Sequence, residues 1–380
     1  MKIKPCLKTF KFFIRSKIIQ NNKHYFAEAD IPSNLIDCHV HSTASPDGFL
    51  TISEIISQAK ENNLSHVAIT DHNTCVGIDS YMRALGAQNN EIYIEQDGVK
   101  LICGAEITCY YHHSRKFSQK LHILCYGFDR NPDNDFMQLL KAKLEDYEET
   151  FFSIPNTLTF YYDIYKDIYN KEDFKNFIFN ERLLHNKNTH DPYSSDEVVK
   201  YFVSKGLDEK IVRDDIVSLA SLYKQKDNII IKVETVIDLV HKAGGKCMVA
   251  HPLKSYRKFM KKHHFRESDE WAYITSMTNQ LLALGVDGIE LISVANPKSV
   301  IRQRFNDLYK NVGFTAYGSD RHDNTTHSMT MGFIQGYTPP CNFIEVIEDL
   351  QAKQLSPALA ERQKKRQAKI SKSHLNEQTY

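Results

Sequence analysis

The amino-acid sequence predicts an α/β barrel of about seven strand–helix units, interrupted by a helical insertion. Short β-rich runs alternate with amphipathic helical patterns, as in parallel βα units. Polar residues recur where the predicted strands end, and (β/α) barrels build their active sites at that end. We therefore expect the functional residues to gather at one face of the barrel.

Seven segments have the composition of strands, with turn or helix signals between them. In order they are 35–41, 66–71, 101–107, 121–127, 246–250, 286–292 and 314–318. A capping box from Thr51 to Glu54 predicts a helix over 52–63. A second helix is expected over 233–243, where glycines follow it, and a third begins at Asn296-Pro297, because proline favours the first helical position.

The alternating pattern stops between residues 130 and 231. Only helical segments are readable there, and they are 137–151, 164–179, 195–204 and 208–223. A structureless loop of that length is implausible in a compact domain. We interpret the stretch as a helical cap over the active-site face, where it would exclude water and shape substrate choice. The predicted organisation is a basic extension (1–34), a barrel in two parts (35–129 and 232–338), the insertion (130–231), and a C-terminal helix with a basic tail (339–380).

The composition is that of a soluble globular protein, with 380 residues, 42% hydrophobic and 25% charged. A net charge of +1 gives no overall field that favours nucleic acid or membrane. The eight cysteines form no C-x-x-C pair, so we expect reduced thiols and a cytoplasmic protein. No run approaches the ~18 apolar residues of a transmembrane helix.

Both ends of the chain are basic. Residues 1–24 carry seven Lys or Arg and no acid, which fits a terminal extension or a basic helix that touches membrane or RNA. The segment after residue 355 fits a solvated tail or an RNA contact. The sequence indicates no particular protein partner.

The chemistry centres on the segment from Asp37 to His41. Because side chains alternate along a strand, Asp37, His39 and His41 share one face, and Cys38 and Val40 the other. Imidazole suits Zn, Fe and Mn, and a carboxylate favours harder ions such as Mn. A polar edge strand with its histidines in water would have the same pattern, so one H-x-H is a weak signal.

Further segments carry metal-ligand residue types at or after the other predicted strands. They contain Asp71 and His72, Glu106, His122, His251, and Asp320 with His322. Singly, each has an ordinary structural explanation, such as a helix cap for Asp71 or a core histidine for His122. Burying this many His, Asp and Glu at one barrel mouth would be costly unless they are paired or bind metal.

In this order, the motifs resemble those of the polymerase and histidinol phosphatase (PHP) superfamily of metal-dependent phosphoesterases. The resemblance covers roughly residues 35–128 and 232–338. It implies a distorted (β/α)7 TIM-like PHP barrel with up to three divalent ions, Mn being favoured and Zn or Fe the alternatives.

The resemblance also implies the residues of the site. The metal ligands would be His39, His41, Asp47, His72, Glu106 (as a bridging carboxylate), His122, His251, Asp320 and His322. The implied catalytic set is His39, His41, Glu106, His251, Asp320 and His322. Asp37 and Asp71 would orient imidazoles by accepting their distal N–H.

Within the superfamily, segments such as IDCHVHSTAS, AITDHNT, GAEIT and GSDRHD are most similar to one bacterial branch. Its members hydrolyse 3′,5′-nucleoside bisphosphates and trim short RNAs from the 5′ end, and they carry a helical insertion at the same place. The insertion here matches poorly. Two residues have open roles: Lys254 is a phosphate contact or a surface lysine, and Arg321 points at substrate phosphate or at solvent.

The predicted function is that of a metal-dependent phosphoesterase that hydrolyses phosphate esters of nucleotides or short RNA. Metals about 3.5–4 Å apart would clamp an in-line displacement and hold the attacking hydroxide. One alternative is a histidinol-phosphate or phosphotyrosine phosphatase on the same barrel, and another is a non-catalytic binding scaffold. We expect no proofreading role beside a polymerase, since no polymerase-sized segment follows residue 338.

Overall fold

The structure is a computed structural model, and it describes part of the chain. The described residues are 35–45, 47–114, 117–184, 195–219, 229–291, 308, 312–322 and 341–355. The predictions for the N-terminal extension, the helix at Asn296-Pro297 and the basic tail lie outside these residues.

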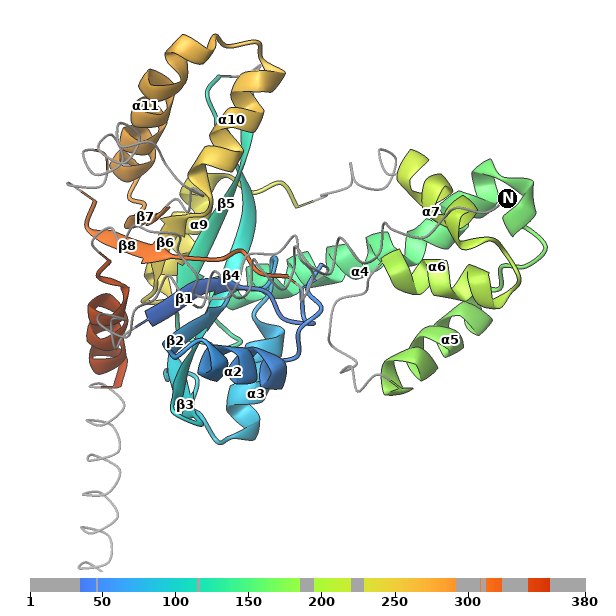
Figure 1. The fold of residues 1–380 in the computed structure, drawn as a ribbon, viewed down its shortest axis with the longest axis horizontal. Coiled ribbons are helices and arrows are strands. Elements are labelled where there is room, and N and C mark those ends of the chain that lie inside the picture. Colours follow the sequence, from blue (N-terminus) through green and yellow to red (C-terminus); the bar gives the residue numbers. More distant parts are fainter. Residues whose placement is uncertain are drawn as a thin grey trace, which may run out of the picture. The chain divides into compact units, whose positions relative to one another are not determined.

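An eight-stranded sheet forms the centre of the fold, with strand order β1-β2-β4-β5-β6-β7-β8 and β3 paired to β4 (Figure 1). The strands are β1 Leu35–Val40, β2 Leu64–Ile69, β3 Tyr93–Gln96, β4 Val99–His112, β5 Ser118–Tyr126, β6 Lys246–Val249, β7 Gly288–Leu291 and β8 Phe314–Tyr317. All seven predicted strands are present. The short strand β3 was not predicted from the sequence.

The two ends of the sheet meet just beyond β1 and β8. Val40 and Arg321 form a parallel bridge, and the His41 N–H donates to the Arg321 carbonyl at 2.9 Å. The Phe49 N–H donates to the His322 carbonyl at 2.8 Å. The sheet is therefore a nearly closed barrel, as predicted.

The direction of one strand differs from the prediction of parallel βα units throughout. β2–β4, β6–β7 and β7–β8 are parallel, but β5 is antiparallel to both β4 and β6. A parallel crossover needs a dozen or more residues, and only residues 113–117 separate β4 from β5. β4 and β5 therefore form a long hairpin.

The helices that flank the sheet are α2 Ile52–Glu61, α3 Val76–Ala84, α9 Val233–Lys242, α10 Pro252–Lys262 and α11 Glu270–Ala283. The predicted capping box is present: Thr51 Oγ1 accepts from the Glu54 N–H at 3.2 Å, and Glu54 Oε2 accepts from the Thr51 N–H at 2.8 Å. α9 ends before Gly244, whose φ of +80° suits glycine. A further helix spans 343–355.

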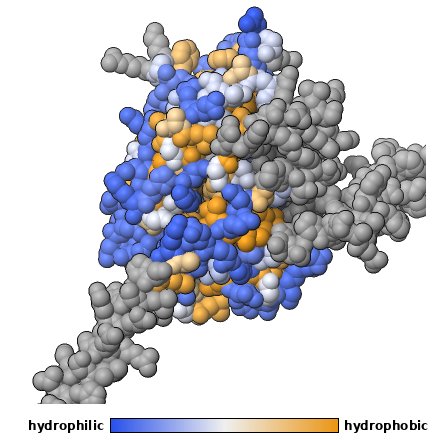
Figure 2. All heavy atoms as spheres, turned by 90° about the vertical axis from the view of Figure 1, so that its left-hand side faces the viewer, coloured by the Kyte–Doolittle hydropathy of each residue, from blue (hydrophilic) through white to orange (hydrophobic). Residues whose placement is uncertain are grey.

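The barrel core is an apolar cluster to which most strands and the 343–355 helix contribute. Its buried members include Ile36, Cys38, Ala68, Ile102, Leu124, Tyr126, Met248, Phe314, Ala316, Phe343, Ile347 and Leu350. On the face drawn in Figure 2, hydrophilic side chains surround a band of hydrophobic ones. No helix among the described residues is both long enough and apolar enough to span a membrane.

Between β5 and β6 the described chain is helical. The elements are α4 Asp135–Tyr161, the 3-10 turn η1 Asp163–Tyr165, α5 Lys171–Leu184, α6 Ser195–Ser204 and α7 Glu209–Ser218. α4 continues ten residues past its predicted end at 151 and includes Pro155. These helices share a separate buried cluster that includes Phe151, Leu158, Tyr165, Phe174, Tyr201 and Phe202. The insertion thus has its own core, whereas its bounds stay a prediction.

This separate core gives a prediction about stability. The Phe174 side chain is fully buried and its ring centroid lies 5.0 Å from that of Tyr201. We expect Phe174→Ala to lower the free energy of unfolding by about 3–5 kcal/mol, because the large side chain leaves a cavity. Phe160→Ala is the control, since Phe160 is 77% exposed. Urea unfolding followed by circular dichroism measures both, and equal effects would contradict the separate core.

Candidate metal centre

The ends of the strands bring the predicted ligands into one cluster. Within it, ligand atoms of three overlapping groups lie within 4.8 Å of one another: His41, Asp47, His72 and His322; His39, His41, Glu106 and Asp320; and His72, Glu106 and His122. His251 joins them through Glu106, because His251 Nε2 lies 2.9 Å from Glu106 Oε1. All nine predicted ligands are therefore together.

Glu106 lies at the centre of the cluster and is fully buried. Its Oε1 atom is 2.8 Å from His122 Nδ1 and 2.9 Å from His251 Nε2. Its Oε2 atom is 2.9 Å from His72 Nδ1 and 3.3 Å from His39 Nε2. A carboxylate with imidazoles around both oxygens has the position of a bridging ligand.

Backbone pairing determines which groups surround Glu106. In the β4–β5 hairpin, Glu106 lies opposite Leu124 and Thr108 opposite His122. Since side chains alternate, His122 is on the same face as Glu106. The Asn73 N–H donates to the Glu106 carbonyl at 2.8 Å, which holds the loop after β2 against β4. The pairing of β4 with β5, and of the loop after β2 with β4, therefore places these side chains next to Glu106.

In the group of His39, His41, Glu106 and Asp320, the two imidazoles face each other. His39 Nε2 and His41 Nε2 are 3.1 Å apart, and Asp320 Oδ1 is 3.4 Å from each. His39 Nδ1 lies 2.9 Å from Glu290 Oε1, so the proton belongs on Nδ1. The Nε2 atom of His39 is therefore directed into the cluster, where it would bind a cation in place of a proton.

The hydrogen bonds of Ser45 lead to the same conclusion for His41. The Ser45 hydroxyl donates to Asp47 Oδ1 at 2.8 Å, so its oxygen accepts from His41 Nδ1 at 3.2 Å. His41 Nε2 is then also directed into the cluster. Imidazole nitrogens and carboxylate oxygens converge here, and Glu106 Oε2 is buried without a hydrogen bond from the described residues. This donor set fits divalent cations.

Asp47 lies at the centre of the group that it forms with His41, His72 and His322. Asp47 Oδ2 lies 3.3 Å from His72 Nε2 and 3.2 Å from His322 Nε2. The His322 ring stacks on that of His41, with centroids 4.2 Å apart. Asp47 is half exposed, so this side of the centre is open to solvent.

The charges of the cluster shift its pKa values. Burial acts to raise the pKa of Glu106, but His72, His39 and His122 outweigh it and hold that pKa well below its usual range. Burial acts to lower the pKa of His72, but Glu106 and Asp47 raise it to about 10. Burial lowers the pKa of His41 to about 4. The buried carboxylates are therefore stable in their ionised form only with positive charge close by.

Two of the clustered residues have strained backbones. His251 has a φ of +28° and Asp320 a φ of +51°, a region that residues with a Cβ seldom adopt. In both places the chain turns sharply after a strand, which directs the side chain into the cluster. Strain of this kind concentrates at functional sites.

Asp37 and Asp71, which were predicted to orient imidazoles, accept hydrogen bonds from backbone groups. Asp37 Oδ1 accepts the N–H of His39 at 3.2 Å and of Ser319 at 3.0 Å. Asp71 accepts the N–H of Ser42 at 2.6 Å and its hydroxyl at 2.7 Å. Both carboxylates thus hold segments that carry ligands or lie beside them.

Three residues that we did not single out in the sequence contact the imidazoles. Glu290 lies against His39, Ser45 against His41, and Ser255 Oγ lies 3.3 Å from His251 Nδ1. Glu290 also accepts the His251 N–H. In the sequence, Glu290 could have been recognised as a charged residue within the apolar run of β7. The serines carried no comparable signal.

The two candidate phosphate contacts lie beside the cluster. Lys254 Nζ donates to Asp320 Oδ2 at 3.1 Å, and its side chain is 69% exposed. Arg321 is half-buried, and its backbone forms the bridge to Val40. Lys254 therefore places a cation at the open edge of the site.

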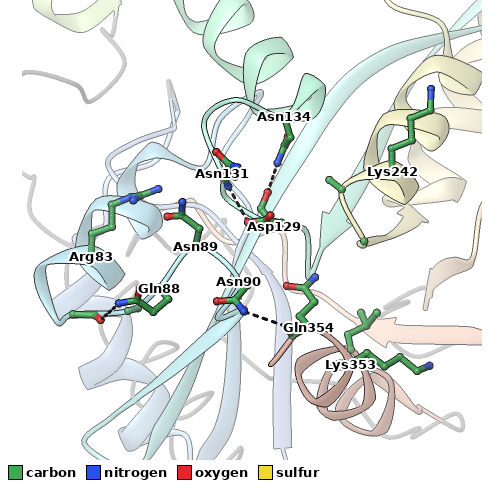
Figure 3. Close-up of a pocket in the computed structure, with 15 residues that line it drawn as sticks. Arg83, Gln88, Asn89, Asn90, Asp129, Asn131, Asn134, Lys242, Lys353 and Gln354 are labelled. Carbon is green, nitrogen blue, oxygen red and sulfur yellow. Dashed lines mark hydrogen bonds between the residues drawn. The ribbon is translucent and has the colours of Figure 1, made fainter. Parts of the chain in front are cut away.

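A separate cavity of about 1130 Å³ is lined by residues from the end of α3 and the loop after it, from the segments that follow β5 and precede β6, and from the 343–355 helix (Figure 3). Its cations are paired within their own helices: Arg83 with Asp79, Lys242 with Asp238, and Lys353 with Asp349. None of the predicted site residues lines it. The nine predicted ligands lie at the other end of the strands, and a smaller group of possible ligands, His241, Cys247 and Asp287, lies near the start of β6.

Comparisons with known proteins agree with this geometry. The chain is 24% identical over 267 residues to a 5′-3′ exoribonuclease of Haemophilus influenzae, covering 69% of this chain and 80% of the relative. It is 33% identical over 93 residues to a phosphoribosyl 1,2-cyclic phosphate 1,2-diphosphodiesterase of Eggerthella lenta, covering 24% and 30% of the two chains.

The fold also has relatives among solved structures. A Bifidobacterium adolescentis protein described as a metal-dependent phosphoesterase superposes with a TM-score of 0.54 at 19% identity, covering 84% of this chain and 98% of its own. Residues 37–313 match the PHP domain family, and this range contains most of the candidate site. The chain therefore belongs to the PHP domain family.

Proposed function

We propose that this chain is a metal-dependent phosphoesterase that hydrolyses phosphate esters of nucleotides or short RNA. The observation that carries the proposal is the convergence of nine imidazole and carboxylate groups, with the buried Glu106 at their centre. The similarity to a 5′-3′ exoribonuclease favours nucleic acid over other phosphate esters.

The ligands would hold three divalent ions, one in each overlapping group. Oxygen and imidazole donors without a thiolate favour Mn, with Zn or Fe as alternatives. When bound, the ions would act as Lewis acids on the phosphoryl oxygens and neutralise the charge of the phosphate. The proposed catalytic residues are His39, His41, Glu106, His251, Asp320 and His322.

The other residues around the site would position and select the substrate. Glu290, Ser45 and Ser255 hold imidazoles in fixed orientations, which keeps their free nitrogens directed into the site. Lys254 offers a cation to an incoming phosphate at the edge of the cluster. Burial raises the pKa of Tyr147 on α4, and the Asp47 carboxylate adds to that effect. The insertion, which begins with α4, is proposed to act as a cap that shapes substrate choice.

We also propose a cytoplasmic setting. The seven described cysteines are free thiols, and six of them are buried. Unpaired, buried thiols are typical of proteins in a reducing compartment.

The proposed function predicts a substrate profile. The Mn-reconstituted protein is expected to hydrolyse adenosine 3′,5′-bisphosphate and a 5′-phosphorylated short RNA, but not histidinol phosphate or a phosphotyrosine peptide. Phosphate and product release measure this. His39→Ala should reduce turnover by about 100-fold or more, because loss of even an outer partner of a ligand costs 10–100-fold.

His66→Ala is the matched control, since His66 lies near the start of β2, away from His72, and belongs to none of the possible ligand groups. Circular dichroism checks that both variants fold. Turnover of histidinol phosphate alone would replace the proposed substrate. Full activity of the folded His39→Ala variant would refute the metal site.

Glu290 gives a second prediction, on metal affinity. Glu290→Ala removes the partner of His39 Nδ1, so we expect Mn affinity to fall about 10–100-fold. Isothermal titration calorimetry measures the affinity. Glu345→Ala is the control, since Glu345 is exposed on the 343–355 helix. Unchanged affinity in Glu290→Ala would show that this carboxylate does not orient the imidazole.

A further inference from the structure

Helix α10 starts at the candidate metal centre. His251 is the residue before its first turn, and Pro252 is its first residue. One turn into the helix, Lys254 contacts Asp320 at 3.1 Å. A ligand that extends from the centre along this side therefore meets the exposed face of α10.

The segment of α10 is strongly basic in a chain that is nearly neutral. Residues 251–266 contain six Lys or Arg and no acid, whereas the whole chain has a net charge of +1. These cations are Lys254, Arg257, Lys258, Lys261, Lys262 and Arg266. Such a local excess creates a positive field that the overall charge conceals.

The cations are divided between paired and unpaired groups. Arg257 pairs with Glu270 at 2.6 Å, and Arg266 pairs with Asp269 at 3.0 Å. For Lys258, Lys261 and Lys262, no carboxylate among the described residues lies within ion-pair distance, and all three side chains are exposed. Their charges are available to a ligand.

The helical repeat aligns these lysines. Leu253, Tyr256, Phe259 and Met260 are buried, and α10 packs against α11 and β5 (Figure 1). On the exposed side, residues four apart are about 6 Å apart along the axis. Lys254, Lys258, Lys261 and Lys262 thus form a continuous stripe, the basic ridge, which begins at Asp320.

Exposed aromatic rings lie at the far end of the ridge. Phe265 is 45% exposed and Phe117 is 47% exposed. The Phe117 ring centroid is 5.2 Å from that of His263, the residue that follows α10. A line of cations with aromatic rings beside it is typical of surfaces that bind single-stranded nucleic acid, where rings stack on bases.

We propose that the basic ridge binds the phosphodiester backbone of a single-stranded oligonucleotide whose scissile phosphate lies at the metal centre. This inference rests on the proposed function and names its substrate class as oligonucleotides rather than mononucleotides alone. Lysines on flexible stems act as point charges, so the ridge binds phosphates without regard to base sequence.

The test replaces the three lysines that do not contact the candidate metal ligands. The triple variant Lys258→Gln, Lys261→Gln, Lys262→Gln is expected to raise KM for a 5′-phosphorylated hexaribonucleotide about tenfold or more. Each phosphate contact contributes about 0.7 to the salt slope of single-strand binding, so the slope should fall by about 2. The kcat/KM for adenosine 3′,5′-bisphosphate should not change, because a mononucleotide does not reach the ridge.

The matched control is Lys60→Gln, Lys242→Gln, Lys353→Gln, which removes the same charge from exposed lysines on α2, α9 and the 343–355 helix. Its KM for the RNA should equal that of the wild type. A labelled hexaribonucleotide with phosphorothioate linkages, which resist hydrolysis, gives the affinity directly by fluorescence anisotropy with the Mn-loaded protein.

The outcomes separate the two proposals. If the wild type hydrolyses neither adenosine 3′,5′-bisphosphate nor the hexaribonucleotide, the proposed function is contradicted. The anisotropy experiment still measures whether the basic ridge binds RNA. A triple variant that binds the RNA as tightly as the wild type overturns the ridge and leaves the function intact. The proposal for the ridge would also be overturned if the Mn-loaded protein bound phosphatidylserine vesicles, but not RNA, through these lysines.

Discussion

The buried carboxylate of Glu106 is the constraint on which the rest of the structure depends. An ionised group without access to water is costly unless positive charge lies beside it. Here four imidazoles from β1, β5 and the ends of β2 and β6 lie within 3.3 Å of its oxygens. Imidazole nitrogens and carboxylate oxygens together form a donor set that fits divalent cations.

The barrel supplies this arrangement because several strands end at one place. Closure matters as much as the strands themselves, since Asp320 and His322 reach the cluster only when β8 lies next to β1. Gly318 permits that approach: a Cβ there would lie 2.2 Å from Glu290 Oε1 and from His39 Cβ. A single residue without a side chain therefore allows the last ligands to meet the first.

Much of the fold was predictable from the sequence, because strands with apolar runs and helices with caps are encoded locally. The nine residues that cluster in the structure were expected from the resemblance to a known family, of which the residue types beside strand ends gave only part. The antiparallel β5, the short β3 and the contacts of Glu290 depend on register between distant segments, which no local pattern reports. α4 continues past its predicted end at 151, and residues on both sides of that point, such as Phe151 and Leu158, belong to the core of the insertion.

The site and α10 together form one surface, because Lys254 at the start of α10 contacts Asp320 in the site. We propose that an oligonucleotide with a phosphate at the metal centre would lie along the lysines of α10. We propose that Glu106 would hold more than one ion, and metal content tests this proposal most directly. Inductively coupled plasma mass spectrometry of the Mn-reconstituted protein should give three ions per chain, one for each overlapping ligand group. Glu106→Gln, checked for folding by circular dichroism, should retain at most one ion per chain. Three ions in the folded variant would contradict the account.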